Sequence, residues 1–161
     1  MSKSLGHVLP DAVATRLSGR DLHSVADQVV IVCTVDDEGF PHVALLSYFE
    51  VLATDRGTMR MATYGDSRTT RYARRTGRAT LVLVDAQVAY YIKATVEEMA
   101  PSMRAAPYNA KLQLRIVDVL ADEANPELEP GAYIASGLTY VNPQRARELD
   151  RARLLLAELR E

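Results

Sequence analysis

The sequence has a single cysteine, no tryptophan and no excess of charge of either sign. Because Cys33 stands alone, an intrachain disulfide and a cysteine-based zinc site are both excluded. Nineteen basic and 21 acidic residues give a formal net charge of -2, so no chain-wide field attracts nucleic acid or acidic lipid. No apolar run reaches the roughly 18 to 20 residues that a membrane span requires. These absences predict a protein of a reducing, cytoplasmic setting that binds neither membranes nor nucleic acid.

The composition is that of one folded domain. Apolar residues make up 48% of the chain and charged residues 25%, which excludes a disordered, collagen-like or low-complexity protein. A chain of 161 residues can bury a core that needs no disulfide or metal ion. We therefore expect a single domain spanning residues 1–161.

Short apolar runs bounded by turn residues indicate strands that are joined by hairpins. The clearest run is Val29–Val35, a β-branched segment that is too short for a typical helix. Acidic residues and Gly39 follow it, and this turn predicts a hairpin whose second strand covers residues 41–49. Further strands are predicted over residues 58–64, 79–85, 88–96, 112–120 and 132–140, whereas residues 97–108 are predicted to form a loop and a turn. The pattern therefore predicts a mainly β fold, an antiparallel barrel of six or seven strands with flanking helices.

Three segments carry helix signals. The first covers about residues 10–17. The second covers residues 67–76 and ends at Gly77, since glycine tolerates the backbone conformation that closes a helix. The third begins at an Asn-Pro pair and forms a C-terminal amphipathic helix over about residues 143–160. Its apolar stripe, which packs against the body of the protein or against a partner, consists of Leu149, Ala152, Leu156 and Leu159.

The most informative stretch covers residues 60–78 and reads RMATYGDSRTTRYARRTGR. A strand leads into a turn that contains glycine, and Ser67, Arg68 and Thr69 then occupy the first turn of the predicted helix. The first N–H groups of a helix have no intrahelical acceptor and the helix dipole adds positive charge, so such a start binds anions. Hydroxyl groups and an arginine fork complete a phosphate-binding cradle. The alternative is that Asp66 or Ser67 only caps the helix and that the arginines are solvated.

Five arginines within residues 68–78 raise the alternative of a nucleic-acid-binding surface. The negative net charge and the lack of a nucleic-acid-binding motif argue against it. Elsewhere, His42 is interpreted as a surface or interface residue, with contact to a ligand as the alternative. Cys33 is interpreted as a small buried hydrophobe with a raised pKa. The acidic residues 36–38 are interpreted as a solvated loop. We therefore assign no catalytic residue and no metal site from the sequence.

The order of these segments resembles the FMN-binding split barrels of the pyridoxamine 5'-phosphate oxidase-like family. The resemblance covers roughly residues 29–96, and its motifs are the Asp-Asp-Glu-Gly turn, the Phe-Pro-His strand, the Asp-Arg-Gly turn, the Thr-Met-Arg-Met-Ala-Thr-Tyr strand and the Ser-Arg-Thr-Thr-Arg helix. It implies a split β-barrel that forms a homodimer with flavin sites at the interface. The leucine stripe of the last helix adds apolar surface for such a dimer. By position, the resemblance assigns the flavin to Arg60, Met61, Ala62 and Thr63, and the flavin phosphate to Ser67, Arg68 and Thr69.

The same resemblance implies an oxidoreductase that binds FMN without a covalent bond and transfers electrons or hydride to a small molecule. Many family members have a lysine at the position of Thr69, so Arg68 or Arg71 must supply the cation for the phosphate. The chain lacks the tryptophan and the C-terminal segment that recognise the pyridine substrate, which excludes a true pyridoxamine phosphate oxidase. The alternatives are a deazaflavin-dependent reductase on the same fold and a protein that binds a flavin or another small molecule without catalysis.

Overall fold

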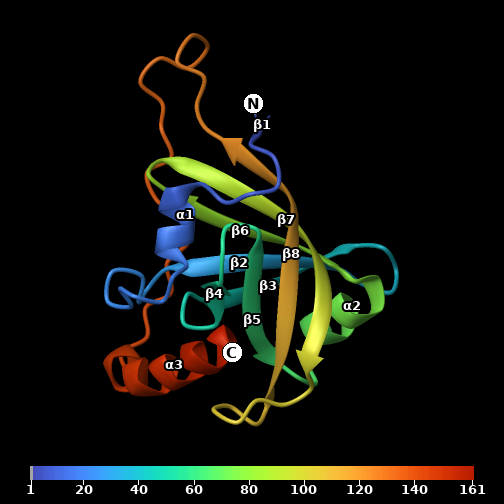
Figure 1. Ribbon diagram of the computed structural model, residues 1–161. Coiled ribbons are helices and arrows are strands. Elements are labelled where there is room, and N and C mark those ends of the chain that lie inside the picture. The colour runs from blue at the N-terminus through green and yellow to red at the C-terminus, as the bar shows by residue number, and fades with distance from the viewer. Residues whose placement is uncertain (1) are drawn as a thin grey trace.

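The computed structural model describes residues 2–161 and shows a curled antiparallel sheet with flanking helices (Figure 1). Its strands are β1 (Lys3–Ser4), β2 (Val29–Val35), β3 (Pro41–Ser47), β4 (Val51–Ala53), β5 (Thr58–Tyr64), β6 (Arg78–Asp85), β7 (Val88–Ala100) and β8 (Asn109–Asp122). Its helices are α1 (Asp11–Arg16), α2 (Arg68–Thr76) and α3 (Arg145–Arg160). The order across the sheet is β3-β2-β6-β7-β8-β5-β4, and β1 pairs with β8. These seven strands form a half-barrel, so the predicted mainly β split barrel is confirmed.

Turn chemistry sets the register of the two hairpins that the sequence predicts most clearly. The β2–β3 turn closes at Gly39 with φ of +91°, and the carboxylate of Asp36 accepts the N–H groups of Glu38 and Phe40. The β6–β7 turn consists of Ala86 and Gln87, which both have positive φ, at +48° and +69°. Two positive φ angles give the turn the twist that matches the flanking strands.

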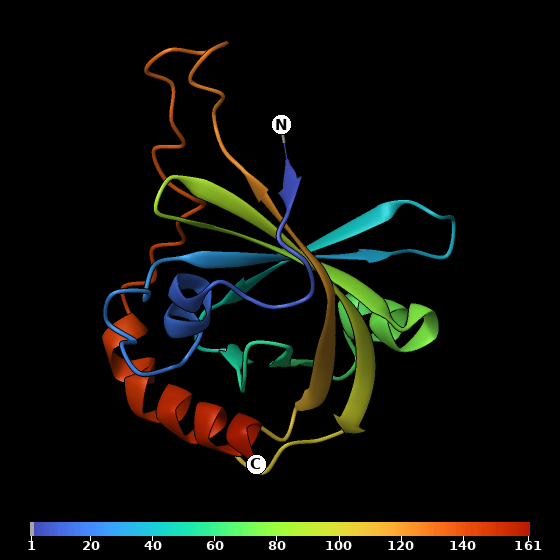
Figure 2. The ribbon, with the colours of Figure 1, turned by 45° about the horizontal axis from the view of Figure 1, so that its top comes forward.

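Two apolar clusters hold the fold together. The main core contains inward-facing side chains of the strands together with Val13 and Leu17 from the α1 region. The second cluster lies between α3 and the strands β4 and β5, along which α3 runs (Figure 2). Here Leu156 and Leu159 of α3 are buried together with Leu52 of β4. The predicted apolar stripe of the last helix therefore packs against the body of its own chain. It does not supply the exposed apolar surface on which the expected dimer partly depended.

Several predicted boundaries are corrected by the structure. The strand predicted over residues 41–49 ends at Ser47, and the chain then turns into the unpredicted β4, which pairs with β5. β7 continues to Ala100, so the loop predicted over residues 97–108 begins later. The predicted strand over residues 132–140 is wrong, because only an isolated bridge between Gln28 and Thr139 forms there. The apolar residues of this segment have no neighbouring strand in register, so they do not form a ladder of backbone hydrogen bonds.

Within residues 2–161, none of the helices has the length and apolar character that crossing a membrane requires.

Candidate functional site

A buried cluster of hydroxyl groups anchors the start of α2 to the end of β5. The Oγ1 of Thr70, a fully buried residue, donates to the carbonyl oxygen of Tyr64 at 2.7 Å. The same Oγ1 lies 2.6 Å from Oγ1 of Thr63 and 3.0 Å from Oγ of Ser67. Ser67 is the N-cap residue, and its Oγ accepts the N–H of Thr70 at 3.2 Å. These bonds fix the first turn of α2 against the sheet.

The first turn of α2 also presents donors that no other group uses. The backbone N–H groups of Arg68 and Thr69 have no acceptor within residues 2–161. The exposed guanidinium of Arg68 likewise forms no hydrogen bond or ion pair with the described part of the chain. Two free N–H groups and a free guanidinium at the positive end of a helix form a site for an anion such as a phosphate group.

The neighbouring arginines of α2 are already bound to carboxylates. Arg71 and Arg75 reach Asp37 in the β2–β3 turn, at 3.3 and 3.2 Å. Arg74 is paired with a glutamate of β7. The sequence left open whether Arg68 or Arg71 supplies the cation, and the structure leaves Arg68 as the unpaired one. These ion pairs also remove much of the free positive charge on which the nucleic-acid alternative depended.

His42 joins this site from β3. Its Nε2 lies 3.2 Å from Oγ1 of Thr69, and its ring meets the Tyr72 ring edge-on with 5.1 Å between centroids. The sequence favoured a surface or interface role for His42 over contact with a ligand, and it did not place His42 beside the first turn of α2. No local signal could have revealed it, because β3 and α2 come together only through the curl of the sheet.

The β5 residues that the resemblance assigned to the flavin face both sides of the sheet. Met61 lies in the main core and Thr63 belongs to the hydroxyl cluster. Ala62 is fully buried beneath α3, and Nη1 of Arg60 donates to a carbonyl oxygen in the last turn of α3 at 2.7 Å. The structure therefore brings together Ser67, Arg68 and Thr69, and Thr63 joins them through Thr70. The side chains of Arg60, Met61 and Ala62 lie apart from this group, in the main core or beneath α3. Contact between a bound flavin and Arg60 or Ala62 would require α3 to move.

Two cations lie beneath the last turn of α3. Arg60 donates to the carbonyl oxygen of Leu159 at 2.7 Å, and Nζ of Lys111 donates to that of Glu158 at 2.6 Å. The last carbonyl groups of a helix lack intrahelical donors and carry partial negative charge, so both contacts are favourable. Burial lowers the pKa of Lys111, and the neighbouring Arg60 lowers it further. α3 is therefore attached to the sheet by polar as well as apolar contacts.

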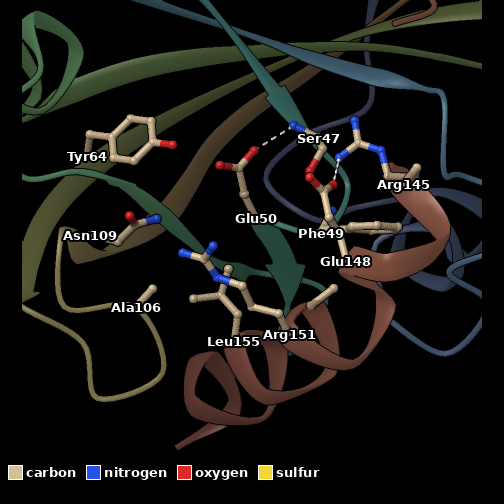
Figure 3. A pocket seen from close by; sticks show the side chains of 11 residues that line it. Ser47, Phe49, Glu50, Tyr64, Ala106, Asn109, Arg145, Glu148, Arg151 and Leu155 are labelled. Carbon is tan, nitrogen blue, oxygen red and sulfur yellow. Dashed lines mark hydrogen bonds and ion pairs between the residues drawn. The ribbon is translucent and has the colours of Figure 1, made fainter. Parts of the chain in front are cut away.

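A pocket of about 220 Å³ lies between the first half of α3, the β3–β4 turn, and the ends of β5 and β8 (Figure 3). Tyr64 connects this pocket to the start of α2, since its carbonyl group anchors Thr70 while its side chain lines the pocket. The carboxylate of Glu50 accepts the N–H of Ser47 at 2.8 Å, and burial raises the pKa of this carboxyl group. The sequence analysis missed the pocket, because its residues come from separate segments with no common motif.

The hydroxyl cluster gives a first testable prediction. We expect Thr70→Val to lower the free energy of unfolding by about 1–3 kcal/mol, because it removes the buried partner of Thr63 and Tyr64. Urea unfolding followed by circular dichroism measures this change. The matched control is Thr58→Val, since the Thr58 hydroxyl has no partner within the described chain, and it should change stability by less than about 0.5 kcal/mol. Equal losses in the two variants would contradict the anchoring role of Thr70.

Comparison of the sequence with known proteins identifies a family. Residues 20–133 match the sequence model of the pyridoxamine 5'-phosphate oxidase family. The Bacillus subtilis (strain 168) protein YclD, whose function is uncharacterized, is 28% identical over 116 residues, which cover 72% of this chain and 75% of YclD.

Solved structures share the fold. A Lactobacillus delbrueckii protein that is proposed to be a pyridoxamine 5'-phosphate oxidase aligns with a TM-score of 0.58 at 19% identity, covering 73% of this chain and 98% of that chain. A variant of HupZ from Group A Streptococcus aligns with a TM-score of 0.51 at 15% identity, covering 64% of this chain and 98% of that chain. At these identities the similarity concerns the fold alone.

Proposed function

Since the chain belongs to the pyridoxamine 5'-phosphate oxidase family, we propose that it is a flavoprotein that binds FMN without a covalent bond. In this proposal it is an oxidoreductase that transfers electrons or hydride to a small molecule. The observation that carries the flavin assignment is the start of α2, where Arg68 and two backbone N–H groups are free to bind a phosphate.

The residues at the start of α2 fit the phosphate group of FMN. A phosphate monoester presents several acceptor oxygens and up to two negative charges. Arg68 offers a guanidinium fork, and the N–H groups of Arg68 and Thr69 offer two further donors. His42 adds a ring nitrogen beside Thr69, the position at which many family members have a lysine. Bound FMN would supply the redox chemistry, and this chain would hold the phosphate and shape the substrate pocket.

The flavin proposal is tested by the visible absorption spectrum of the purified protein before and after addition of FMN, with unbound ligand removed each time. We expect a retained flavin band that is perturbed by the protein. Retention of a deazaflavin instead of FMN would select the deazaflavin alternative, and retention of neither would overturn both assignments. Turnover with a nicotinamide donor would then distinguish an oxidoreductase from a protein that only binds the flavin.

A homodimer is the second part of the proposal. The outer face of β2 and β3 exposes Val35, Val43 and Leu45, whose exposed fractions are 42%, 55% and 54%. Val43 is the register partner of Cys33, so Val35 and Val43 lie on the same face of the sheet. Contiguous apolar surface of this kind is typical of protein interfaces. We expect sedimentation equilibrium to give the mass of a dimer, and a monomer at all concentrations would contradict this proposal.

A further inference from the structure

The pocket in Figure 3 contains hydrogen-bond donors that have no partner in the protein. Tyr64 and Asn109 are register partners at the ends of β5 and β8, so their side chains emerge side by side on one face of the sheet. Arg151 extends from α3 into the same pocket toward Asn109 (Figure 3). The Tyr64 hydroxyl, the Asn109 side-chain amide and the Arg151 guanidinium make no hydrogen bond or ion pair within residues 2–161.

The other charged groups of the pocket are already engaged. Arg145 pairs with Glu148 at 2.9 Å, and Glu148 also accepts the side-chain amide of Asn142 at 3.1 Å. Glu50 accepts the N–H of Ser47 at 2.8 Å, and it forms no ion pair within residues 2–161. Arg151 is therefore the cation of this pocket that has no ion pair within residues 2–161, and it extends toward Asn109 (Figure 3).

The arrangement selects a singly charged anion. Arg151, Tyr64 and Asn109 together match the two oxygens of a carboxylate, because a guanidinium binds carboxylate through paired N–H groups. A phosphate monoester would bring up to two negative charges to a pocket that has one free cation and holds the carboxyl group of Glu50. The side chains of Phe49, Ala106 and Leu155 supply apolar walls for the rest of the ligand.

We infer that this pocket binds the carboxylate group of a small organic acid through Arg151, Tyr64 and Asn109. The inference rests on the proposed function in one respect, which is that the acid is the compound that exchanges electrons with the flavin. Tyr64 fits this role by position, since its backbone anchors the predicted phosphate site and its side chain lines the pocket.

The experiment uses benzoate as the probe and benzamide as its uncharged isostere, titrated calorimetrically into the full chain without added FMN. We expect benzoate to bind at least about 10-fold more tightly than benzamide, since one charge-assisted bond exceeds the 1.4 kcal/mol that corresponds to a factor of ten. Arg151→Gln should remove this preference. The matched control is Arg147→Gln, because Arg147 is also exposed and unpaired on α3 but does not line the pocket.

A second variant tests the carboxyl group that faces the probe. Glu50→Gln keeps an acceptor for the N–H of Ser47 and removes a negative charge, so it should tighten benzoate binding by about 2- to 5-fold. Absence of benzoate binding, equal binding of benzoate and benzamide, or equal effects of Arg151→Gln and Arg147→Gln would each overturn the inference. Weaker benzoate binding in Glu50→Gln would also contradict it.

Retention of FMN, measured on the same preparations, separates this inference from the proposed function. If benzoate binds through Arg151 while FMN is not retained, the flavin proposal fails and the carboxylate site stands. If FMN is retained and benzoate binds without dependence on Arg151, the carboxylate site fails and the flavin proposal stands.

Discussion

Replacing Arg68 with alanine should lower the affinity for FMN by about 10- to 100-fold and leave the affinity for riboflavin unchanged. The guanidinium of Arg68 is exposed and unpaired at the positive end of α2, so it is free to bind the phosphate that FMN has and riboflavin lacks. A hydrogen bond to a charged group contributes about 1.5–3 kcal/mol, which corresponds to this range of affinity. Fluorescence titration of the two ligands measures the change.

The matched control for this prediction is Arg78→Ala. Arg78 is also exposed and has no side-chain partner in the described chain, but it follows the opposite end of α2. We expect this variant to bind FMN like the parent protein. If Arg68→Ala weakened FMN and riboflavin equally, the phosphate assignment would be wrong, and Arg68 would contact the ring or support the fold.

Leu156→Ala is expected to lower the free energy of unfolding by about 2–5 kcal/mol. Leu156 is 1% exposed and packs in the cluster between α3 and the sheet. The Leu156 side chain packs tightly against Gly19, since a Cβ atom added to Gly19 would lie only 3.1 Å from Cδ1 of Leu156. Gly19 has no side chain to fill the space that the leucine vacates, so truncation leaves a cavity. Chemical denaturation gives the size of the loss.

Leu154→Ala provides the comparison on the same helix. Leu154 is 65% exposed, so its truncation removes little buried area and should change stability by less than about 0.5 kcal/mol. A small effect of Leu156→Ala, close to that of Leu154→Ala, would show that α3 is not firmly packed on the sheet.

The helices and strands of this fold could be predicted where turn or cap residues mark their boundaries. β2 is a β-branched run followed by a turn that closes at Gly39, and both of its boundaries are correct. α2 begins after the N-cap Ser67 and ends at Gly77, whose φ of +62° fits the left-handed conformation that glycine favours. These turn and cap residues are neighbours in the sequence of the elements they end, so the boundaries can be predicted without the tertiary structure.

Features that depend on distant partners could not be predicted in this way. β4 is a short strand inside a nearly continuous apolar stretch, and no glycine or proline marks the turn before it. The pocket residues Tyr64, Asn109 and Arg151 belong to two strands and a helix, and no spacing rule relates them. The sequence also could not predict that Arg68 has no ion pair. This depends on which of the neighbouring arginines pair with Asp37 and with a glutamate of β7.

The two cations beneath α3 have a consequence for the biosynthesis of this protein. Arg60 and Lys111 find carbonyl acceptors in the last turn of α3. During translation β5 and β8 leave the ribosome before residues 145–160 do, whereas a domain generally folds as a unit. Until α3 has emerged, the outer face of β5 and both cations remain uncovered and accessible to chaperones. The outer face of β5 is therefore covered only after translation has passed the α3 segment.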